Sequence, residues 1–353
     1  MDDAMIAHSK PCITEEDVDA VRQVLCSGQI AQGELATRFE TAFSERFQYA
    51  GGVATSSGTT ALVLALQAIG VKGSDVLIPS YVCINVYNAV KWAGGRPVLY
   101  DIDENWNPCA SSIETKLSAE TRAIIVVHIF GIPSAMQEVL NLGIPVIEDC
   151  CQAIGLRIGD RFAGAYGDYG VVSFHATKLM TTGEGGMAVS IEPSSCKKLR
   201  AAKEGTVASA SVGFNFPMTD IQARLGISQL HRYDAFLERR SRIAQHYLNA
   251  FSAWPEAIPS YVKQKSLFFR FPLKIKNLHF ESVRQHYLLR GVQVRRGVDA
   301  ILHRLTGLPD EAFPNTTKHF NETLSIPLYP SLDEKEIDSI TKITKEILKR
   351  YAY

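Results

Sequence analysis

Short apolar runs alternate with segments of helical period between about residues 50 and 190. The runs are DVLIPS, RPVLYDID, RAIIVVHIFG, IPVIEDC, GVVSF and GMAVS. Near-continuous apolar runs are typical of strands buried on both faces, and the helical segments between them indicate crossover connections. The pattern predicts an α/β fold in which helices cover a central, mostly parallel sheet.

Capping signals predict helices on either side of this region. Thr14, with Asp17 three residues later, is a capped start for a helix that Gly28 would end. A long helix is expected to begin near Thr219, with Gln222 three residues on, and to continue through IQARLGISQLHRYDAFLERRSRIAQHYLNAF.

The sequence pattern changes beyond about residue 250. FFRFPLKI predicts a strand, and DEKEIDSITKITKEILKR predicts an amphipathic terminal helix. We therefore expect a large domain over residues 1–245, which includes an N-terminal helical segment, and a smaller α+β domain over residues 246–353.

The composition is globular and carries no strong overall charge. The 353 residues are 46% hydrophobic and 21% charged, with a formal net charge of zero. A neutral chain lacks the positive field that recruits nucleic acid or an anionic membrane, so neither is an expected partner. No apolar run approaches the roughly 18 residues of a membrane span, and the start MDDAMIAHSK lacks a signal-peptide core. We expect a cytoplasmic protein.

Seven cysteines are scattered along the chain, at positions 12, 26, 83, 109, 150, 151 and 196. They include no C-x-x-C pair, and the adjacent Cys150 and Cys151 have poor geometry for a shared metal. Reduced thiols and no structural metal are expected.

Polar residues follow the ends of several predicted strands. Ligands in such sheets lie at the carboxyl ends of the strands. The polar side chains could therefore meet in one crevice. They belong to Asp101, Asp103, His128, Glu148, Asp149, Ser173 and Lys178.

A run of hydroxyl and glycine residues, TSSGTTAL, opens the predicted helix TTALVLALQAIG. The start of a helix offers unpaired N–H groups and the positive end of its dipole, and Gly58 lets the backbone approach an anion closely. The run from Thr55 to Thr60 is therefore a candidate phosphate site. An ordinary Ser/Thr helix cap would explain the same residues.

Two charged residues follow buried strands further along the chain. Asp149 in VIEDCCQA needs a partner if it is ionised, and a protonated ring nitrogen would be suitable. Lys178 in SFHATKLMTTGEGG could act as a Schiff-base amine in a desolvated pocket. Taken alone, Asp149 could cap a helix and Lys178 could be a solvated loop residue. A phosphate site, a carboxylate and a lysine in this order are what a pyridoxal 5′-phosphate (PLP) site needs.

Several separated segments resemble the DegT/DnrJ/EryC1/StrS family of sugar aminotransferases, which have fold type I. They are ITEEDVDAVRQVLCSGQIAQG, FE, SGTTAL, VHIFG, IEDCCQAIG, SFHATKLMTTGEGG, GFNFPMTDIQARLGISQL and LSIPLYPSLDEKEI. The segments occur in the family's order and cover nearly the whole chain.

The resemblance implies a PLP-dependent aminotransferase and gives roles to individual residues. Lys178 would form the Schiff base with PLP, Asp149 would pair with the pyridine nitrogen, and Gln152 would lie beside the ring and its 3-hydroxyl. The residues expected to bind the cofactor phosphate are Ser57, Gly58, Thr59 and Ser173. Asn215 would reach the phosphate of the neighbouring subunit, because members of the family are homodimers with shared active sites.

The resemblance also implies the reaction. Glutamate is the expected amino donor, and the form SFHA-x-K followed by T-x-x-EGG looks most like members that aminate C4 of a 4-keto nucleotide sugar. A cyclitol or another non-nucleotide keto substrate is a rival, and so is a regulatory protein that binds PLP without turnover. A 3-dehydratase would have histidine in place of Lys178, and a nicotinamide oxidoreductase would need a G-x-G-x-x-G after a strand, so both are disfavoured.

The chain departs from the family pattern in places. Cys83 stands where an aromatic residue usually stacks on the cofactor ring, and Tyr81 is the first candidate to replace that residue. Ile154 replaces a common histidine and Pro217 replaces a usual arginine, which suggests altered contacts around the substrate phosphates. The family's HY element is not recognisable near GVQVRRGVDAILH.

Overall fold

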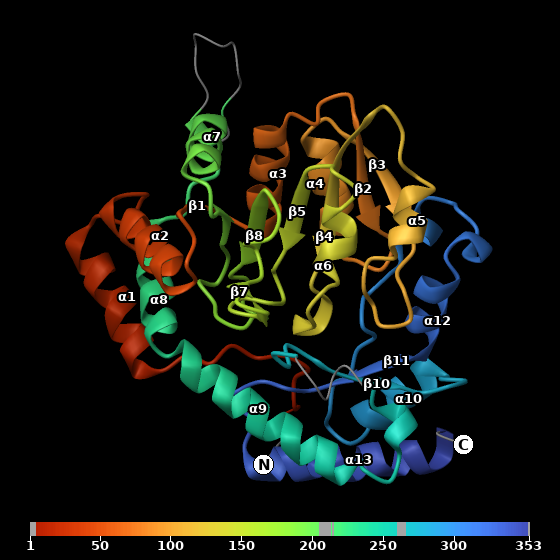
Figure 1. Ribbon diagram of the computed structural model, residues 1–353. Helices are drawn as coiled ribbons and strands as arrows, with labels where there is room; N and C mark the ends of the chain where they lie inside the picture. Colours follow the sequence, from red (N-terminus) through yellow and green to blue (C-terminus); the bar gives the residue numbers. More distant parts are fainter. Residues whose placement is uncertain (1–4, 205–212, 214, 260–265, 352–353) are drawn as a thin grey trace.

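A seven-stranded sheet forms the centre of the protein (Figure 1). The structure is a computed structural model that describes residues 5–204, 213, 215–259 and 266–351. The strand order is β1-β9-β8-β5-β4-β2-β3. The strands are β1 (Gly51–Thr55), β2 (Asp75–Pro79), β3 (Arg96–Tyr100), β4 (Thr121–Val127), β5 (Val146–Asp149), β8 (Tyr169–Ser173) and β9 (Gly186–Ser190).

The sheet is mostly parallel, which confirms the prediction from the apolar runs. Strands β2, β3, β4, β5 and β8 pair in parallel, whereas β9 is antiparallel to both of its neighbours, β8 and β1. Strand β1 therefore points the same way as the parallel strands. Its sequence, GGVAT, is not among the predicted runs, because it is short and begins with two glycines.

Helices cover both faces of the sheet. Alternate residues of a strand point to opposite faces. In β4, Ile125 joins the hydrophobic core under α3 (Gly58–Ile69) and α4 (Ile84–Trp92). Its neighbour Ile124 joins a separate core with Val139 of α6 (Met136–Leu140). Two-sided burial explains why these strands read as continuous apolar runs.

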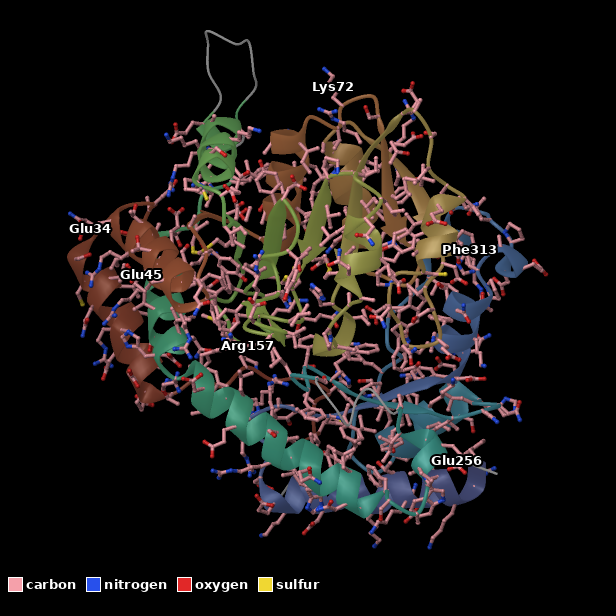
Figure 2. The ribbon with its side chains drawn as sticks, in the orientation of Figure 1. Glu34, Glu45, Lys72, Arg157, Glu256 and Phe313 are labelled. Atoms are coloured by element: carbon pink, nitrogen blue, oxygen red, sulfur yellow. The ribbon has the colours of Figure 1, made fainter. Side chains whose placement is uncertain are left out.

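Further helices flank the β1 end of the sheet. They are α1 (Glu15–Ser27), α2 (Glu34–Arg46), α7 (Pro193–Glu204) and α8 (Asp220–His231). Helix α1 has the predicted capping box at Thr14 and Asp17, and Gly28 ends it with a φ of 73°. Figure 2 shows side chains filling the space between helices and sheet, whereas the labelled Glu34 and Lys72 point outward.

The long helix expected from Thr219 onward is two helices, so that prediction is wrong in part. Helix α8 ends at His231 and α9 (Tyr233–Ala250) begins after Arg232. The junction is fixed from outside the helix: Arg232 forms an ion pair with Asp17, and the Tyr233 hydroxyl donates to the Ile154 carbonyl at 2.6 Å. Periodicity alone could not show these contacts because they join distant parts of the chain.

Most C-terminal elements pack around a core of their own below the sheet in Figure 1. They are β10 (Phe271–Lys274), α10 (Phe280–Leu288), β11 (Thr323–Ile326) and α13 (Glu334–Tyr351). The helices α11 (Leu302–Leu305) and α12 (Pro314–Glu322) instead lie against the core of the central sheet, which Leu302 and Phe320 contact. The expected strand in FFRFPLKI and the terminal helix are therefore present. Tyr233 and Phe236 of α9 join the core beside β9, whereas Ile243 and Tyr247 join the C-terminal core. The division at residue 245 stays a prediction.

Short elements complete the described chain. They are α5 (Ala110–Glu114), the two-stranded pair β6 (Arg157–Ile158) and β7 (Arg161–Phe162), and the 3₁₀ turns Ile129–Gly131, Pro255–Ala257 and Asp310–Ala312. Within the described ranges, no helix has both the length and the apolar character needed to cross a bilayer.

Candidate active site

The candidate site lies at the carboxyl edge of the sheet. Strands β1, β5 and β8 end at Thr55, Asp149 and Ser173, and they share one direction. The segments that follow these strands carry the predicted phosphate site, the predicted carboxylate and Lys178. Parallel topology thus brings the three parts to one edge.

The start of α3 has a side-chain cap and still leaves backbone N–H groups for an anion. The Ser57 hydroxyl accepts a hydrogen bond from the Thr60 N–H at 3.1 Å, and the Ser57 N–H donates to the Thr60 hydroxyl at 3.0 Å. Ser57 therefore caps the helix, as the alternative explanation of an ordinary Ser/Thr cap predicts. Helix geometry still leaves the N–H groups of Gly58 and Thr59 without an intrahelical acceptor, so they can bind an anion.

Glycine at position 58 is required by close packing. A Cβ at Gly58 would lie 2.7 Å from Cβ of Ser173 and 3.3 Å from Sγ of Cys151. A Cβ at Gly186 would lie 2.3 Å from the carbonyl oxygen of Ser57. The helix start can therefore lie directly against the ends of β8 and β9 only without side chains at these two positions.

Asp149 is a buried carboxylate at the end of β5. Its side chain is 8% exposed, and Oδ1 accepts a hydrogen bond from the Cys151 N–H at 2.9 Å. No Lys, Arg or His of the described chain lies within 4.0 Å of the carboxylate. An ionised carboxylate at this depth needs a cation for stability. The observed site therefore fits a bound cationic ring.

Lys178 lies half-buried in the loop after β8. Its Nζ is 5.4 Å from the centre of the Phe269 ring, a cation–π contact, and it forms no ion pair with any described residue. The Lys178 N–H donates to the His175 carbonyl at 2.9 Å, which fixes the backbone of the loop. The fold thus positions the amine, and no described carboxylate pairs with it and keeps it from reacting.

Cys151 lies close to both charged groups. Burial and then the negative charge of Asp149 raise the pKa of the Cys151 thiol, whereas the positive charge of Lys178 lowers it. The thiol also lies beside Gly58 at the start of α3. The Cys151 thiol is therefore near the start of α3 and within the electrostatic reach of both Asp149 and Lys178.

Gln152 and Ser173 are held by the backbone. Gln152 Oε1 accepts a hydrogen bond from the Phe130 N–H at 2.7 Å, whereas its amide NH₂ donates to no described residue. The Ser173 hydroxyl lies against Gly58 and has a long contact of 3.4 Å with the His175 N–H. Both positions suit their predicted roles, which stay predictions.

Asn215 is exposed and lies next to a segment that touches the helix start of its own chain. The Phe216 carbonyl accepts a hydrogen bond from the Ser56 N–H at 3.0 Å. A hollow of about 580 Å³ opens there, lined by Ser56, Ser57, Thr59, Thr60, Val63, Asn85, Trp92 and Phe216. The contact of Asn215 with a neighbouring subunit stays a prediction.

Two of the acidic residues expected at the crevice have structural roles instead. Asp101 accepts hydrogen bonds from the N–H groups of Asn315 and Thr316 and so caps the start of α12. Asp103 Oδ1 accepts from the N–H groups of Asn105 and Asn107 in its own turn. The expectation that these two carboxylates converge on the site is wrong.

His128 and Glu148 also turn away from the site. Both are fully buried, and His128 Nε2 lies 2.9 Å from Glu148 Oε2. Glu148 accepts further bonds from the N–H groups of Gly164, Tyr166 and Gly167. Glu148 precedes Asp149 in the strand and therefore points to the opposite face. Its oxygens are occupied, so its grouping with His128 and Cys150 is a hydrogen-bonded cluster and does not indicate a metal site.

Tyr81 does not replace the missing ring-stacking residue. Its side chain is 2% exposed and packs edge-to-face against Phe130 and near-perpendicular to His319. Its hydroxyl would lie 2.1 Å from a Cβ at Gly297, so it fills the space that a side chain at position 297 would take. Cys83 is exposed and caps α4 without a side-chain hydrogen bond. The proposed substitution by Tyr81 is therefore wrong, because the ring has no free face.

Ile154 and Pro217, two of the departures from the family pattern, differ in how far they are buried. Ile154 is 1% exposed and lies in the core with Phe47 and Tyr233, so its side chain does not face a substrate. Pro217 is half-buried beside the Phe216 segment. Of the two departures, only Pro217 stays a candidate for altered substrate contacts.

The sequence pattern does not indicate a role in the site for Phe269 or Cys151. Phe269 belongs to FFRFPLKI, whose pattern predicts only a strand, and it comes from a different part of the chain than Lys178. Cys151 stands out in the sequence only as a possible metal ligand. Its position two residues after a strand-terminal aspartate could have indicated the site.

A relative with a named activity is similar to about two thirds of the chain. GDP-perosamine synthase of Escherichia coli O157:H7 is 34% identical over 251 residues, which are 67% of this chain and 69% of that protein.

Solved structures show the same fold. The aminotransferase from Psychrobacter cryohalolentis is 28% identical and superposes with a TM-score of 0.88 over 98% of this chain and 99% of its own. Spr1654 from Streptococcus pneumoniae, in its PLP form, is 23% identical with a TM-score of 0.91 over 98% and 99% of the two chains, and a PMP form is also solved.

The family profile accounts for nearly the whole chain. The DegT/DnrJ/EryC1/StrS aminotransferase family matches residues 11–345, which include every predicted site residue. Fold and sequence agree with the resemblance drawn from the motifs. The protein belongs to the DegT/DnrJ/EryC1/StrS aminotransferase family and is an aminotransferase.

Proposed function

We propose that this aminotransferase moves an amino group from an amino acid, with glutamate as the expected donor, to a keto sugar. The acceptor we expect is a 4-keto nucleotide-linked deoxysugar. One observation carries the proposal: Asp149 and Lys178 carry opposite charges, lie around the same thiol, and pair neither with each other nor with any other described charge. Two such groups beside a free helix start form a site for a phosphorylated cationic ring.

PLP would supply an electron sink for the carbon that loses its proton. The N–H groups of Gly58 and Thr59, with the Ser57 and Ser173 hydroxyls, would hold its phosphate at the start of α3. Asp149 would keep the ring nitrogen protonated, because a buried carboxylate stabilises a nearby positive charge. The free Gln152 amide would donate to the ring's 3-oxygen.

Lys178 would bind the cofactor and then move the proton. Its neutral amine can take a proton from the donor's α-carbon and deliver it to the carbon of the cofactor that takes over the amino group. The Phe269 ring stabilises the charged amine by contact with its face, so Lys178 stays positioned between the two steps.

The proposal also specifies the amino acceptor, a nucleotide sugar, and the assembly, a homodimer. GDP-perosamine synthase, by its name, makes an amino sugar, and similarity to it supports a nucleotide-sugar acceptor here. The hollow beside Trp92 and Phe216 opens at the phosphate end of the site, where Asn215 of a second copy would enter a shared active site. We therefore propose a homodimer in which each subunit completes the site of the other.

The half-reaction with glutamate tests the proposed activity. Purified protein loaded with PLP is mixed with glutamate, and the absorbance of the cofactor and the 2-oxoglutarate formed are measured together. We expect loss of the PLP absorbance and one 2-oxoglutarate per site. An unchanged spectrum would favour a regulatory PLP-binding protein and would contradict the proposal.

The acceptor is identified from the product. The aminated protein is mixed with a panel of 4-keto and 3-keto nucleotide sugars and a keto-cyclitol, and products are analysed by mass. We expect one amino group on a 4-keto nucleotide sugar. Amination of the cyclitol alone would contradict the sugar assignment and leave the aminotransferase activity intact.

A further inference from the structure

Arg270 is a half-buried cation near the candidate site, and it forms no ion pair with a described acidic residue. It lies just before β10, and its Nη1 donates to the carbonyls of Arg296 and Gly297 at 3.2 and 2.8 Å. Its Nε is buried and has no hydrogen-bond acceptor in the described chain. Burial and then the charge of Arg295 lower the pKa of Arg270 to about 10, so the guanidinium stays charged near neutral pH.

Arg270 and Lys178 flank the same aromatic ring. The centre of the Phe269 ring lies 5.7 Å from Cζ of Arg270 and 5.4 Å from Nζ of Lys178. The nearby carboxylate of Asp299 does not neutralise Arg270: its one ion pair in the described chain is with Arg295, at 4.0 Å. A desolvated guanidinium without an acidic partner costs stability unless an anion binds it.

We propose that Arg270 binds a carboxylate of the amino donor. This inference rests on the proposed function, because it assumes that an amino acid reacts at Lys178. Nη1 is occupied by two protein carbonyls and Nε is covered by neighbouring atoms, whereas Nη2 donates no hydrogen bond within the described chain. Nη2 can therefore bind a carboxylate in a charge-assisted hydrogen bond. A carboxylate of the donor lies a few bonds from the reacting amine, whereas the phosphates of a nucleotide sugar lie across the sugar ring from C4.

Binding is measured without turnover. Borohydride-reduced protein, in which the cofactor is fixed, is titrated with glutarate and separately with UDP by calorimetry. For Arg270→Leu we expect glutarate to bind about 30-fold more weakly, the size of loss expected for a hydrogen bond between two charged groups. UDP binding should stay within about twofold of the wild type. Unchanged glutarate binding, or weakened UDP binding alone, would overturn the proposal.

Two control variants distinguish carboxylate binding by Arg270 from effects of misfolding and from general electrostatic attraction. Arg270→Lys keeps the charge, but one ammonium nitrogen cannot bind the two carbonyls and also stand at the position of Nη2, so we expect an intermediate, roughly tenfold loss of glutarate affinity. Arg295→Leu removes an exposed charge close to Arg270 and should change affinity by less than about threefold. Equal losses in Arg270→Leu and Arg295→Leu would show that general electrostatic attraction, and not a bound carboxylate, is responsible.

The donor's two carboxylates are distinguished by matched amides. Glutamine lacks the distal carboxylate of glutamate, and isoglutamine lacks the α-carboxylate. The penalty of Arg270→Leu on the half-reaction should persist with one amide and vanish with the other, which names the carboxylate that Arg270 binds. Equal penalties for both amides would refute the proposal. If the wild type itself forms no 2-oxoglutarate from glutamate, the proposed function fails, and the glutarate titration still tests Arg270.

Discussion

Asp149 ends β5 and Lys178 lies in the loop after the neighbouring parallel strand β8, and these oppositely charged residues form no ion pair. Cys151 is within the electrostatic reach of both. Direct pairing would neutralise the two groups and leave neither available for chemistry. Their separation therefore makes the site suitable for a ligand that presents a cation to Asp149 and an electrophilic carbon to Lys178.

Replacing Asp149 by asparagine should slow the reaction without emptying the site. Asparagine keeps the shape and the hydrogen bond from the Cys151 N–H, but a neutral amide cannot hold a ring nitrogen protonated. We expect the glutamate half-reaction to slow by at least about 100-fold, with PLP still bound. Stopped-flow absorbance measures the rate.

The exposed Asp19 of α1 supplies the matched control for this change. Asp19→Asn alters one charge by the same amount, far from the site and on the surface, and should react at the wild-type rate. A wild-type rate in Asp149→Asn would remove Asp149 from its proposed role.

Asn215 tests the shared site. If Asn215 completes the partner's phosphate pocket, a heterodimer of Lys178→Ala and Asn215→Ala subunits places both lesions in one site and none in the other. The mixture should regain up to about half of the wild-type activity per dimer, although each homodimer is poor. The readout is turnover of tagged heterodimers after subunit exchange.

A contact within one chain supports the alternative, in which Asn215 belongs to the site of its own subunit. Phe216 contacts Ser56 of its own chain, so Asn215 could instead serve its own subunit. Every heterodimer site would then carry one lesion, and absence of rescue with confirmed exchange would contradict the shared pocket.

Glu148 should contribute to stability and not to catalysis. Burial would raise the pKa of its carboxyl, but the hydrogen bond and charge of His128 and the N–H groups of Gly164 and Gly167 bring it below the ordinary 4.5. A lowered folded-state pKa means that the contribution is present above pH 4.5 and is lost as the pH falls through the folded-state value. Wild-type stability should therefore fall below about pH 4.5.

The Glu148→Gln variant isolates this effect. An amide cannot accept all the hydrogen bonds that the carboxylate accepts, so we expect a loss of about 3 kcal/mol at pH 7 in urea unfolding. The variant should also lose less stability on acidification than the wild type. Glu120→Gln, at an exposed position, should match the wild type. Equal pH profiles for the wild type and Glu148→Gln would argue against the assigned role.

The sequence predicted the sheet well because burial on two faces leaves a direct mark. Each apolar run became a strand, and the capping signals at Thr14 and Ser57 mark true helix starts. Asp149 and Lys178 were predicted because a charge directly after a buried strand is conspicuous. Strand β1 was missed because GGVAT lacks a long apolar run.

The direction of side chains could not be predicted in the same way. A list of polar residues at strand ends does not say which face each occupies, so Glu148 and Asp149 looked equivalent although they point to opposite sides. Asp101 caps a helix that begins more than 200 residues later in the chain. Arg270 has a local signal, a charge inside the apolar FFRFPL, but its position beside Phe269 and Lys178 depends on the packing of the C-terminal elements against the sheet.

Covalent labelling of Lys178 tests the central claim most directly. Protein incubated with PLP is reduced with borohydride, digested, and the modified peptide is identified by mass spectrometry. We expect one phosphopyridoxyl group per chain, on Lys178, and none at that peptide in Lys178→Ala, whose turnover should fall at least about 1000-fold. Labelling of another lysine, or of none, in the folded wild-type protein would contradict the account.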